Sequence, residues 1–340
     1  MTDIFIKSFN RPHYLDRCIF SIFKNVKGDF RVTVLDDGTP EKYLQKLKEK
    51  YPNVIFKLSS QAEQKRKAIE ENLLTGSPIS GFTIPILDWK EAVKSGTDYL
   101  IMTEDDVWIT QEIDINKLKD YMLQYDMTLI KLGWISKTKI SSSFHKLNSM
   151  LYGITPAVKL YPRWFMECYM RNKYKVFSIM YRLGMATHNS KKEYWVMNAL
   201  LMGLYRKDYW LAVWSSLHTK VDETEQLINA ASWYRKNKKA NRFGKLTFDM
   251  MTTTFQSSAT TSYHEHYKIN LDINKLNHYL NEEWYCGNLN VYEDLPKDIS
   301  VEKFKTILDK YNDSACTYEN WMLWRNCFRQ QYIRQNVEVD

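Results

Sequence analysis

Three consecutive carboxylates, Glu104, Asp105 and Asp106, directly follow the apolar run YLIMT at residues 99–103. Such a run is typical of a buried strand, and adjacent negative charges at its end lower stability unless positive charge neutralises them. Mg²⁺ and Mn²⁺ prefer carboxylate oxygens, and one or two carboxylates with substrate phosphates are a common ligand set. The cluster therefore predicts a metal site, and the alternative is a solvated loop with helix-capping acids.

Two further polar clusters lie at the ends of strand-like runs. Asp36 and Asp37 follow the run FRVTVL, and Ser8 and Asn10 lie at the end of the first apolar run of the chain. The Asp-Asp-Gly sequence is compatible with a simple turn. A carboxylate in this position can also accept hydrogen bonds from a nucleobase or a ribose.

The elements that position these clusters alternate between strand-like and helical patterns. Strands are predicted at residues 3–9, 30–35, 54–58 and 99–103, and helices at residues 12–23, 43–47, 60–74 and 86–94. This alternation predicts a parallel sheet with right-handed crossovers, and such sheets bind ligands at the carboxyl ends of their strands. All three clusters should therefore meet at one edge of the sheet.

The alternation is lost from about residue 136, where the sequence becomes aromatic and basic. Residues 151–218 contain ten Lys and Arg against three acids, a net charge of +7 of the +8 carried by the whole chain. The span could be an aromatic core with basic outer faces. It could also lie on a membrane surface over a lipid-linked glycan, or bind nucleic acid.

Three stretches in the first third of the chain, IKSFNRPHYLDRCIFSI, VTVLDDGTPE and DYLIMTEDDVWI, occur in this order. Together they resemble the nucleotide-binding half of family 2 glycosyltransferases. The resemblance implies an α/β fold of the GT-A type, with a Rossmann-like, mostly parallel sheet flanked by helices. It also implies a nucleotide-sugar donor, with a UDP-sugar favoured, and Mn²⁺ or Mg²⁺ as cofactor.

The resemblance implies roles for individual residues. The first-strand motif that borders the nucleotide matches Ser8, Phe9 and Asn10. Asp37 matches the aspartate that contacts the base. Asp106 matches the direct metal ligand, Asp105 the partner nearer the ribose, and Glu104 is a third candidate ligand. Lys7 and Phe9 depart from the family pattern, in which a small residue and a tyrosine are common, so the nucleotide is left open.

An inverting transferase also needs a base that removes the proton from the acceptor hydroxyl. The family places an acid downstream of the metal motif, and the stretch HTKVDETEQLI offers Asp222, Glu223 and Glu225. We favour Glu223 or Asp222. The alternative is that these acids only stabilise the first turn of a helix, where negative charge is favourable.

Two other groups could assist the chemistry. A basic run could reach a diphosphate or an acidic acceptor, or could be a solvated helix end: Arg235, Lys236, Lys238, Lys239 and Arg242. His264 and His266 could supply a metal ligand or a base, or could be exposed loop histidines.

The resemblance leads to a predicted division into three parts. We expect a nucleotide-sugar-binding core over residues 1–135, an acceptor-binding and base-carrying part over 136–270, and a helical, aromatic-rich extension over 271–340. The expected activity is metal-dependent transfer of one sugar to a hydroxyl of a glycan or lipid-linked glycan, with inversion, in surface polysaccharide or glycoconjugate assembly. The Q-x-x-R-W signature of processive relatives is absent from the sequence.

Other functions stay open at this point: a transferase acting on modified nucleic acid bases, a nucleotidyltransferase, and a non-catalytic module that binds sugar or nucleic acid. Five scattered cysteines without C-x-x-C spacing argue against a disulfide framework and a zinc site. We read no signal peptide and no membrane-spanning run. A cytoplasmic location is therefore expected, with peripheral contact at the inner face of the membrane as an option.

Overall fold

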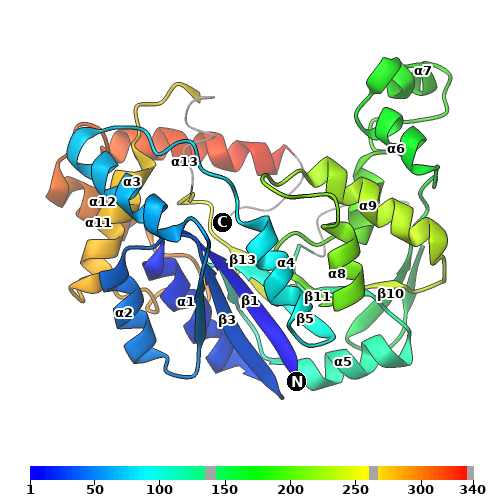
Figure 1. The fold of residues 1–340 in the computed structure, drawn as a ribbon, viewed down its shortest axis with the longest axis horizontal. Coiled ribbons are helices and arrows are strands. Elements are labelled where there is room, and N and C mark those ends of the chain that lie inside the picture. The colour runs from blue at the N-terminus through cyan, green and yellow to red at the C-terminus, as the bar shows by residue number, and fades with distance from the viewer. Residues whose placement is uncertain (135–142, 260–266, 335–340) are drawn as a thin grey trace.

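Within the described residues, nine strands form one central sheet that helices flank (Figure 1). The structure is a computed structural model that describes residues 1–134, 143–259 and 267–334. The strand order is β4-β3-β1-β5-β11-β8-β12-β10-β9. The bounds are β1 Thr2–Ser8, β3 Phe30–Asp36, β4 Ile55–Leu58, β5 Tyr99–Glu104, β8 Leu129–Lys131, β9 Ser143–Lys146, β10 Leu151–Thr155, β11 Gly203–Arg206 and β12 Phe243–Leu246.

The sheet is largely parallel in direction. β1 pairs in parallel with β3 and β5, and β3 pairs in parallel with β4. On the other side of β5, β11 is antiparallel to β5 and β8, and β10 is antiparallel to β12 and β9. β8 and β12 pair in parallel. Two small ladders lie outside this sheet, β2 (Val26–Lys27) with β7 (Ile113–Asp114), and β6 (Val107–Ile109) with β13 (Met251–Thr253).

The helices follow the strands and continue through the C-terminal part. Those of the first half are α1 Pro12–Asn25, α2 Glu41–Lys50, α3 Ala62–Thr75, α4 Ile86–Lys94 and α5 Ile115–Gln124. The later ones are α6 Arg163–Met170, α7 Val176–Arg182, α8 Lys207–Val213, α9 Glu223–Lys236, α11 Ile273–Tyr285, α12 Val301–Tyr311 and α13 Tyr318–Ile333. Two 3₁₀ helices, η1 (Lys173–Lys175) and η2 (Lys192–Met197), lie between α6 and β11.

The apolar character of β1 follows from its position in the sheet. Ile4 and Ile6 belong to one buried cluster and Phe5 belongs to a second one. Because successive side chains of a strand point to opposite faces, the two clusters cover the two faces of the sheet. A strand covered on both faces is apolar without alternation, as is typical of parallel sheets. Pro12 then starts α1 at a position where its missing N–H costs nothing.

The predicted α/β class is confirmed: a large, mostly parallel sheet is flanked by helices, and the C-terminal part is helical and includes the aromatic helix α13. The predicted boundary near residue 136 does not interrupt the sheet, because β10, β11 and β12 extend it. The division into three parts stays a prediction.

Within the residues that the structure describes, no helix combines the length and apolarity that crossing a membrane requires.

Candidate active site

The three polar clusters meet at the carboxyl ends of β3, β1 and β5. In the parallel register, Ser8 lies opposite Asp36 and Lys7 lies opposite Glu104. Beyond the strands, the Asp105 N–H donates to the carbonyl of Lys7 at 2.9 Å. The structure therefore brings together the clusters that the sequence placed on one edge, as the topology of a parallel sheet requires.

A pocket of about 290 Å³ opens at this edge. Its wall consists of the strand ends, the loop before α4 and one turn of α3. The lining residues that carry charge or hydrogen-bonding groups include Lys7, Ser8, Arg11, Asp37, Lys65, Glu104 and Asp105. Phe9 and Phe82 supply aromatic surface. Such a concave site with a few polar groups is the usual form of a small-molecule site.

Each acid of the strand-end cluster has a cationic partner. Arg11 donates to Asp105 at 2.5 Å and to Asp106 at 2.8 Å, and Lys7 donates to Glu104 at 2.6 Å. Both cations are buried, with exposed fractions of 4% and 8%. Three carboxylates thus face two cations, so that one negative charge is left without compensation when all five groups are ionised.

Burial and repulsion dominate the electrostatics of this cluster. Burial raises the pKa of Asp105 and of Asp106 above the usual range, although the charge of Arg11 opposes this effect. Burial also acts on Glu104, but the charge of Lys7 and its hydrogen bond lower the pKa of that carboxyl. The environment therefore favours the arrival of additional positive charge near Asp105 and Asp106.

The two predicted metal ligands differ in how fully they are engaged. Asp105 uses one oxygen for Arg11 and the other for the N–H of Phe9 at 3.0 Å. Asp106 keeps Oδ1 buried and without a hydrogen-bond partner. Within the described ranges, no three His, Cys, Asp or Glu side chains are grouped as a complete metal cage. The residues fit a hard cation held by Asp106 together with substrate oxygens.

Asp37 lies across the pocket and is held by two neighbours. Lys65 donates to its Oδ2 at 2.5 Å, and the Ser59 hydroxyl donates to Oδ1 at 2.6 Å. Burial raises the pKa of Asp37, and the hydrogen bonds from Lys65 and Ser59 oppose this rise. The Lys65 ammonium lies 5.9 Å from the ring centres of both Phe9 and Phe82. This side of the pocket thus combines aromatic surface with a fixed hydrogen-bond acceptor.

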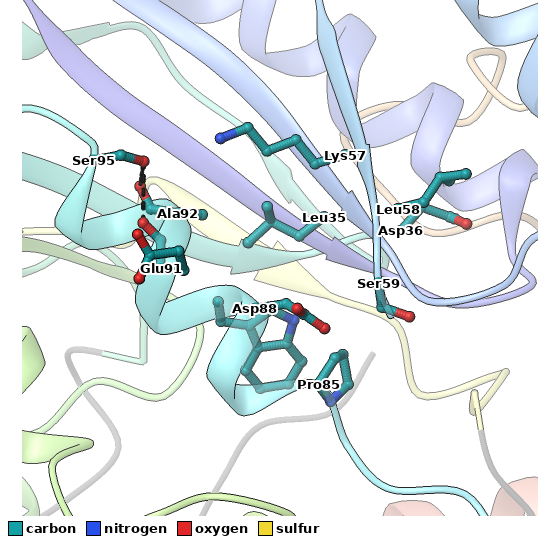
Figure 2. A pocket seen from close by; sticks show the side chains of 11 residues that line it. Leu35, Asp36, Lys57, Leu58, Ser59, Pro85, Asp88, Glu91, Ala92 and Ser95 are labelled. Carbon is teal, nitrogen blue, oxygen red and sulfur yellow. Dashed lines mark hydrogen bonds between the residues drawn. The ribbon is translucent and has the colours of Figure 1, made fainter. Parts of the chain in front are cut away.

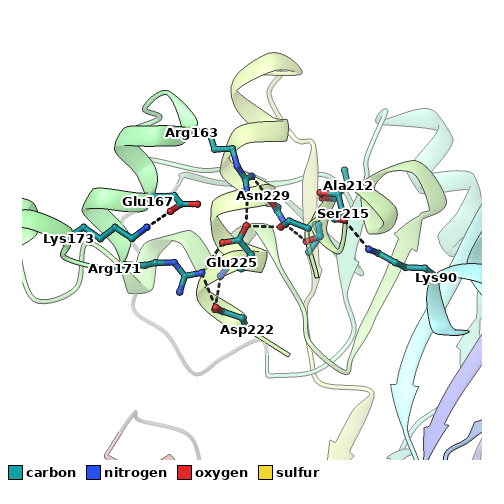
Figure 3. A network of polar contacts seen from close by, with 12 residues as sticks. Lys90, Arg163, Glu167, Arg171, Lys173, Ala212, Ser215, Asp222, Glu225 and Asn229 are labelled. Atoms are coloured by element: carbon teal, nitrogen blue, oxygen red, sulfur yellow. Dashed lines mark hydrogen bonds and ion pairs between the residues drawn. The ribbon is translucent and has the colours of Figure 1, made fainter. Parts of the chain in front are cut away.

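The acids predicted to include a base lie at the start of α9. Asp222 caps the helix by accepting the N–H of Glu225 at 2.9 Å, and it also accepts from Arg171 at 2.8 Å. Glu225 is buried in a network with Arg163, Arg171 and Ser216 (Figure 3). The hydrogen bonds and cations lower the pKa of both carboxyls, against the effect of burial. Both groups are therefore held in structural contacts.

Glu223 remains as the acid with an exposed carboxylate. The preceding segment touches the pocket wall, because the Ile84 N–H donates to the carbonyl of Thr219 at 3.0 Å. Loss of solvation and then repulsion from Asp222 and Glu104 raise the pKa of Glu223. Glu223 itself does not line the pocket.

Asn10 and the basic run do not line the pocket. Asn10 is buried, and its side chain donates to Asn274 of α11 at 2.7 Å, so it contacts the C-terminal part. The basic run does not reach the site, because Arg242 precedes β12 and pairs with Asp126 before β8, at the opposite edge of the sheet. The hypothesis that this run binds a diphosphate is wrong. His264 and His266 lie outside the described residues.

Sequence reasoning missed two cations of the site, Arg11 and Lys65. Arg11 lies inside the first matching stretch and directly follows the end of the strand. This position indicates that its side chain can reach the site. Lys65 lies on a polar helix with many charged residues, and no local pattern distinguishes it from its neighbours. Only the packing of α3 against the strand ends identifies it.

A second pocket of about 200 Å³ lies between β4 and α4 (Figure 2). Lys57 of β4 and Asp88 and Glu91 of α4 are among its lining residues, and it shares Trp89 with the larger pocket. None of Glu104, Asp105 and Asp106 lines it. The larger pocket is therefore the candidate active site.

Fold and pocket together define an α/β protein with an acid-lined site at the carboxyl edge of a parallel sheet. Residues 3–72 match the family model described as glycosyl transferase family 2. This segment contains the first two of the three stretches that carry the predicted resemblance, so the resemblance to family 2 glycosyltransferases is confirmed. No curated protein matches the sequence.

Several solved structures are similar to the chain at low identity. The structure of S. aureus TarS residues 1–349 in complex with UDP-GlcNAc has 14% identity and covers 97% of this chain and 92% of that chain, with a TM-score of 0.42. The galactosyltransferase LgtC, in complex with donor and acceptor sugar analogs, has 14% identity and covers 68% and 70%, with a TM-score of 0.33. The mannosyltransferase PcManGT from Pyrobaculum calidifontis, with GDP-Man and Mn²⁺, has 11% identity and covers 38% and 34%, with a TM-score of 0.27.

Proposed function

We propose that the protein is a glycosyltransferase that moves one sugar from a nucleotide-sugar donor to a hydroxyl group. The observation that carries the proposal is the pocket at the carboxyl ends of β1, β3 and β5. Its lining includes Asp37, which lies in the segment that matches the glycosyl transferase family 2 model, together with Glu104 and Asp105 of the acid cluster. Ligands of open parallel sheets bind at this edge.

The two sides of the pocket suit the two ends of a nucleotide. Phe9 and Phe82 offer flat surfaces for a base, and Asp37, fixed by Ser59 and Lys65, offers an oriented acceptor for its N–H groups. Lys7 and Arg11 line the same pocket near the acids and carry the positive charge that phosphate oxygens require. We favour a UDP-sugar as the donor.

Mn²⁺ or Mg²⁺ is the proposed cofactor. Asp106 would hold it through the oxygen that has no partner, with Asp105 and Glu104 setting the negative potential around it. A bound divalent cation neutralises charge on a diphosphate leaving group. Arg11 and Lys7 contribute further positive charge that is fixed before the reaction starts, which favours the departing diphosphate.

Glu223 is the proposed base, and Asp222 serves as the helix cap. The acceptor oxygen attacks the anomeric carbon, the bond from that carbon to the diphosphate oxygen breaks, and the acceptor proton moves to the Glu223 carboxylate. Attack opposite to the leaving group gives inversion. The pKa of Glu223 is raised above its usual value, which is the direction that makes a carboxylate a stronger base. We propose a glycan or a lipid-linked glycan as the acceptor, in the assembly of a surface polysaccharide or glycoconjugate.

The test is donor turnover by the purified chain. The chain is incubated with UDP-, GDP-, CDP- and dTDP-sugars and Mn²⁺, and release of the nucleoside diphosphate is measured. Each reaction is run with and without a mixture of glycan acceptors obtained by lipid extraction. We expect one nucleotide class to be consumed, faster with acceptor, and the activity to be lost with EDTA. If no class is consumed or bound, the chain is not a transferase of this kind.

A further inference from the structure

The corner formed by α6, η1 and α7 lies away from the central sheet (Figure 1). It exposes apolar side chains. Six large apolar residues are solvent-exposed within the 22 residues from 164 to 185: Trp164, Tyr174, Ile179, Tyr181, Leu183 and Met185. Tyr174 is 86% exposed, Trp164 69% and Leu183 67%. Single exposed apolar residues are ordinary, but a concentration of this kind marks a surface that binds something.

The backbone at the tip of this corner is strained. Asn172, Tyr174 and Lys175 have φ angles of 53°, 53° and 57°, in the left-handed region that non-glycine residues avoid. Tyr174 is bulky and fully outside the core, so its own packing does not offset the strain. Strain that persists in a folded chain points to a functional position of the side chain that it holds.

Basic residues also lie on η1, on α7 and at the start of η2. Lys175, Arg182 and Lys192 are exposed, and within the described part of the chain they have no carboxylate partner. Ile179 of α7 and Leu183, the residue that follows α7, are four positions apart and lie on one side of it, while the neighbouring Met180 is buried. Aliphatic side chains beside free ammonium and guanidinium groups are the pattern of a surface that lies on an anionic bilayer.

We propose that this corner docks on the surface of an anionic phospholipid bilayer. Ile179, Leu183 and Tyr174 enter the interfacial layer, while Lys175, Arg182 and Lys192 contact lipid phosphates. A nucleic acid would use the charges and the aromatic rings but would gain little from the aliphatic side chains of α7. The combination therefore favours a bilayer.

Ion pairs tie the corner to the start of α9, where the proposed base Glu223 lies (Figure 3). Arg171 of the loop after α6 pairs with Asp222 and Glu225 at 2.8 Å, and Arg163 pairs with Glu225. Glu223 therefore starts a helix that is fastened to the docking corner. If the proposed function holds, the docked protein would present Glu223 to a lipid-borne acceptor. The docking itself does not depend on that function.

Vesicle co-sedimentation of the full chain tests the docking. Vesicles contain phosphatidylcholine alone or phosphatidylcholine with phosphatidylglycerol, at low and at high salt, without nucleotide. We expect binding to the anionic vesicles, weakened by salt. The variant K175E/R182E/K192E should lower the partition coefficient by at least about 100-fold, from roughly fivefold for each basic residue. The variant I179S/L183S should lower it by at least about tenfold for each residue.

The matched control reverses three exposed lysines on other helices, K24E/K67E/K117E, and should keep most of the binding. Far-UV circular dichroism and melting curves establish that every variant is folded. Three results would overturn the proposal: no sedimentation with anionic vesicles, an equal loss in the control, or unchanged binding of I179S/L183S. If I179S/L183S kept its binding to anionic vesicles and also bound single-stranded DNA, the corner would be assigned to nucleic-acid binding instead. Nucleotide binding, measured separately, reports on the proposed function.

Discussion

At the scale of single residues, the site depends on how Arg11 is shared between Asp105 and Asp106. The guanidinium is buried and its pKa is raised by the three nearby carboxylates, against the effect of burial, so it stays charged. It is bidentate across two acids, an arrangement that a lysine cannot reproduce. A metal ion at Asp106 would share the role of counter-ion with Arg11.

Replacing Arg11 tests this sharing. Arg11→Met leaves two buried carboxylates without their cation and should lower the free energy of unfolding by about 3–5 kcal/mol. Because Mn²⁺ can replace the lost charge, part of the deficit should return when Mn²⁺ is added. Arg11→Lys is the control and should lose less. Urea unfolding with Mn²⁺ or EDTA measures these differences, and a variant as stable as wild type in EDTA would refute the role given to Arg11.

Replacing Glu223 tests the base. Glu223→Gln keeps the size of the side chain and removes its ability to take a proton, so transfer should fall by about 10²–10⁴-fold while donor affinity stays the same. Asp222→Asn should lower activity far less. Any decrease in its free energy of unfolding should come from weakened capping of α9. Turnover and calorimetric titration of the nucleotide separate the two effects. Full activity in Glu223→Gln would exclude it as the base.

At the scale of elements, the parallel strands and their polar ends could be predicted because the signals are local. An apolar run that stops at an acid is visible in the sequence, and sheet topology then places the acids together. Asp36 and Asp37 illustrate this. The cationic partners could not be predicted in the same way, because Lys65 reaches Asp37 only through the packing of α3. Likewise, nothing near Asn10 shows that α11 covers it.

The turn after β3 has a measurable pH signature. Asp36 is fully buried, with Oδ1 accepting the N–H groups of Gly38 and Thr39, while Oδ2 has no partner. Burial raises the pKa of Asp36 to about 6, although these hydrogen bonds oppose the rise. An acid whose pKa is raised in the folded state binds more protons there than in the unfolded chain. Stability should therefore fall as pH rises from about 4 to about 6.

Asp36→Asn removes this titration. Relative to the variant, the wild type should lose up to about 3 kcal/mol of unfolding free energy between pH 4 and pH 6.5, since one pKa unit corresponds to about 1.4 kcal/mol. Urea unfolding of both proteins across this range gives the difference directly. Parallel curves for the two proteins would show that Asp36 is ionised throughout.

At the scale of the whole molecule, the C-terminal part supports the first half of the chain. Asn281 of α11 donates to the carbonyl of Asn10 at 3.1 Å and contacts the ring of His13 at 2.7 Å. The loop that follows β1 is thereby held by a helix some 270 positions later in the chain. Ligand binding at this loop should consequently stabilise the whole fold rather than one segment of it.

The most direct measurement is a thermal-shift screen of the purified chain against UDP, GDP, CDP and dTDP, each with Mn²⁺ and with EDTA. A ligand that binds only the native state raises the melting temperature, and a nucleotide at about 100 times its Kd adds about 2.7 kcal/mol. If the pocket is a donor site, one nucleotide, with UDP favoured, should raise the melting temperature. The rise should require Mn²⁺ and should disappear in Asp106→Ala. No rise with any of the four nucleotides would contradict it.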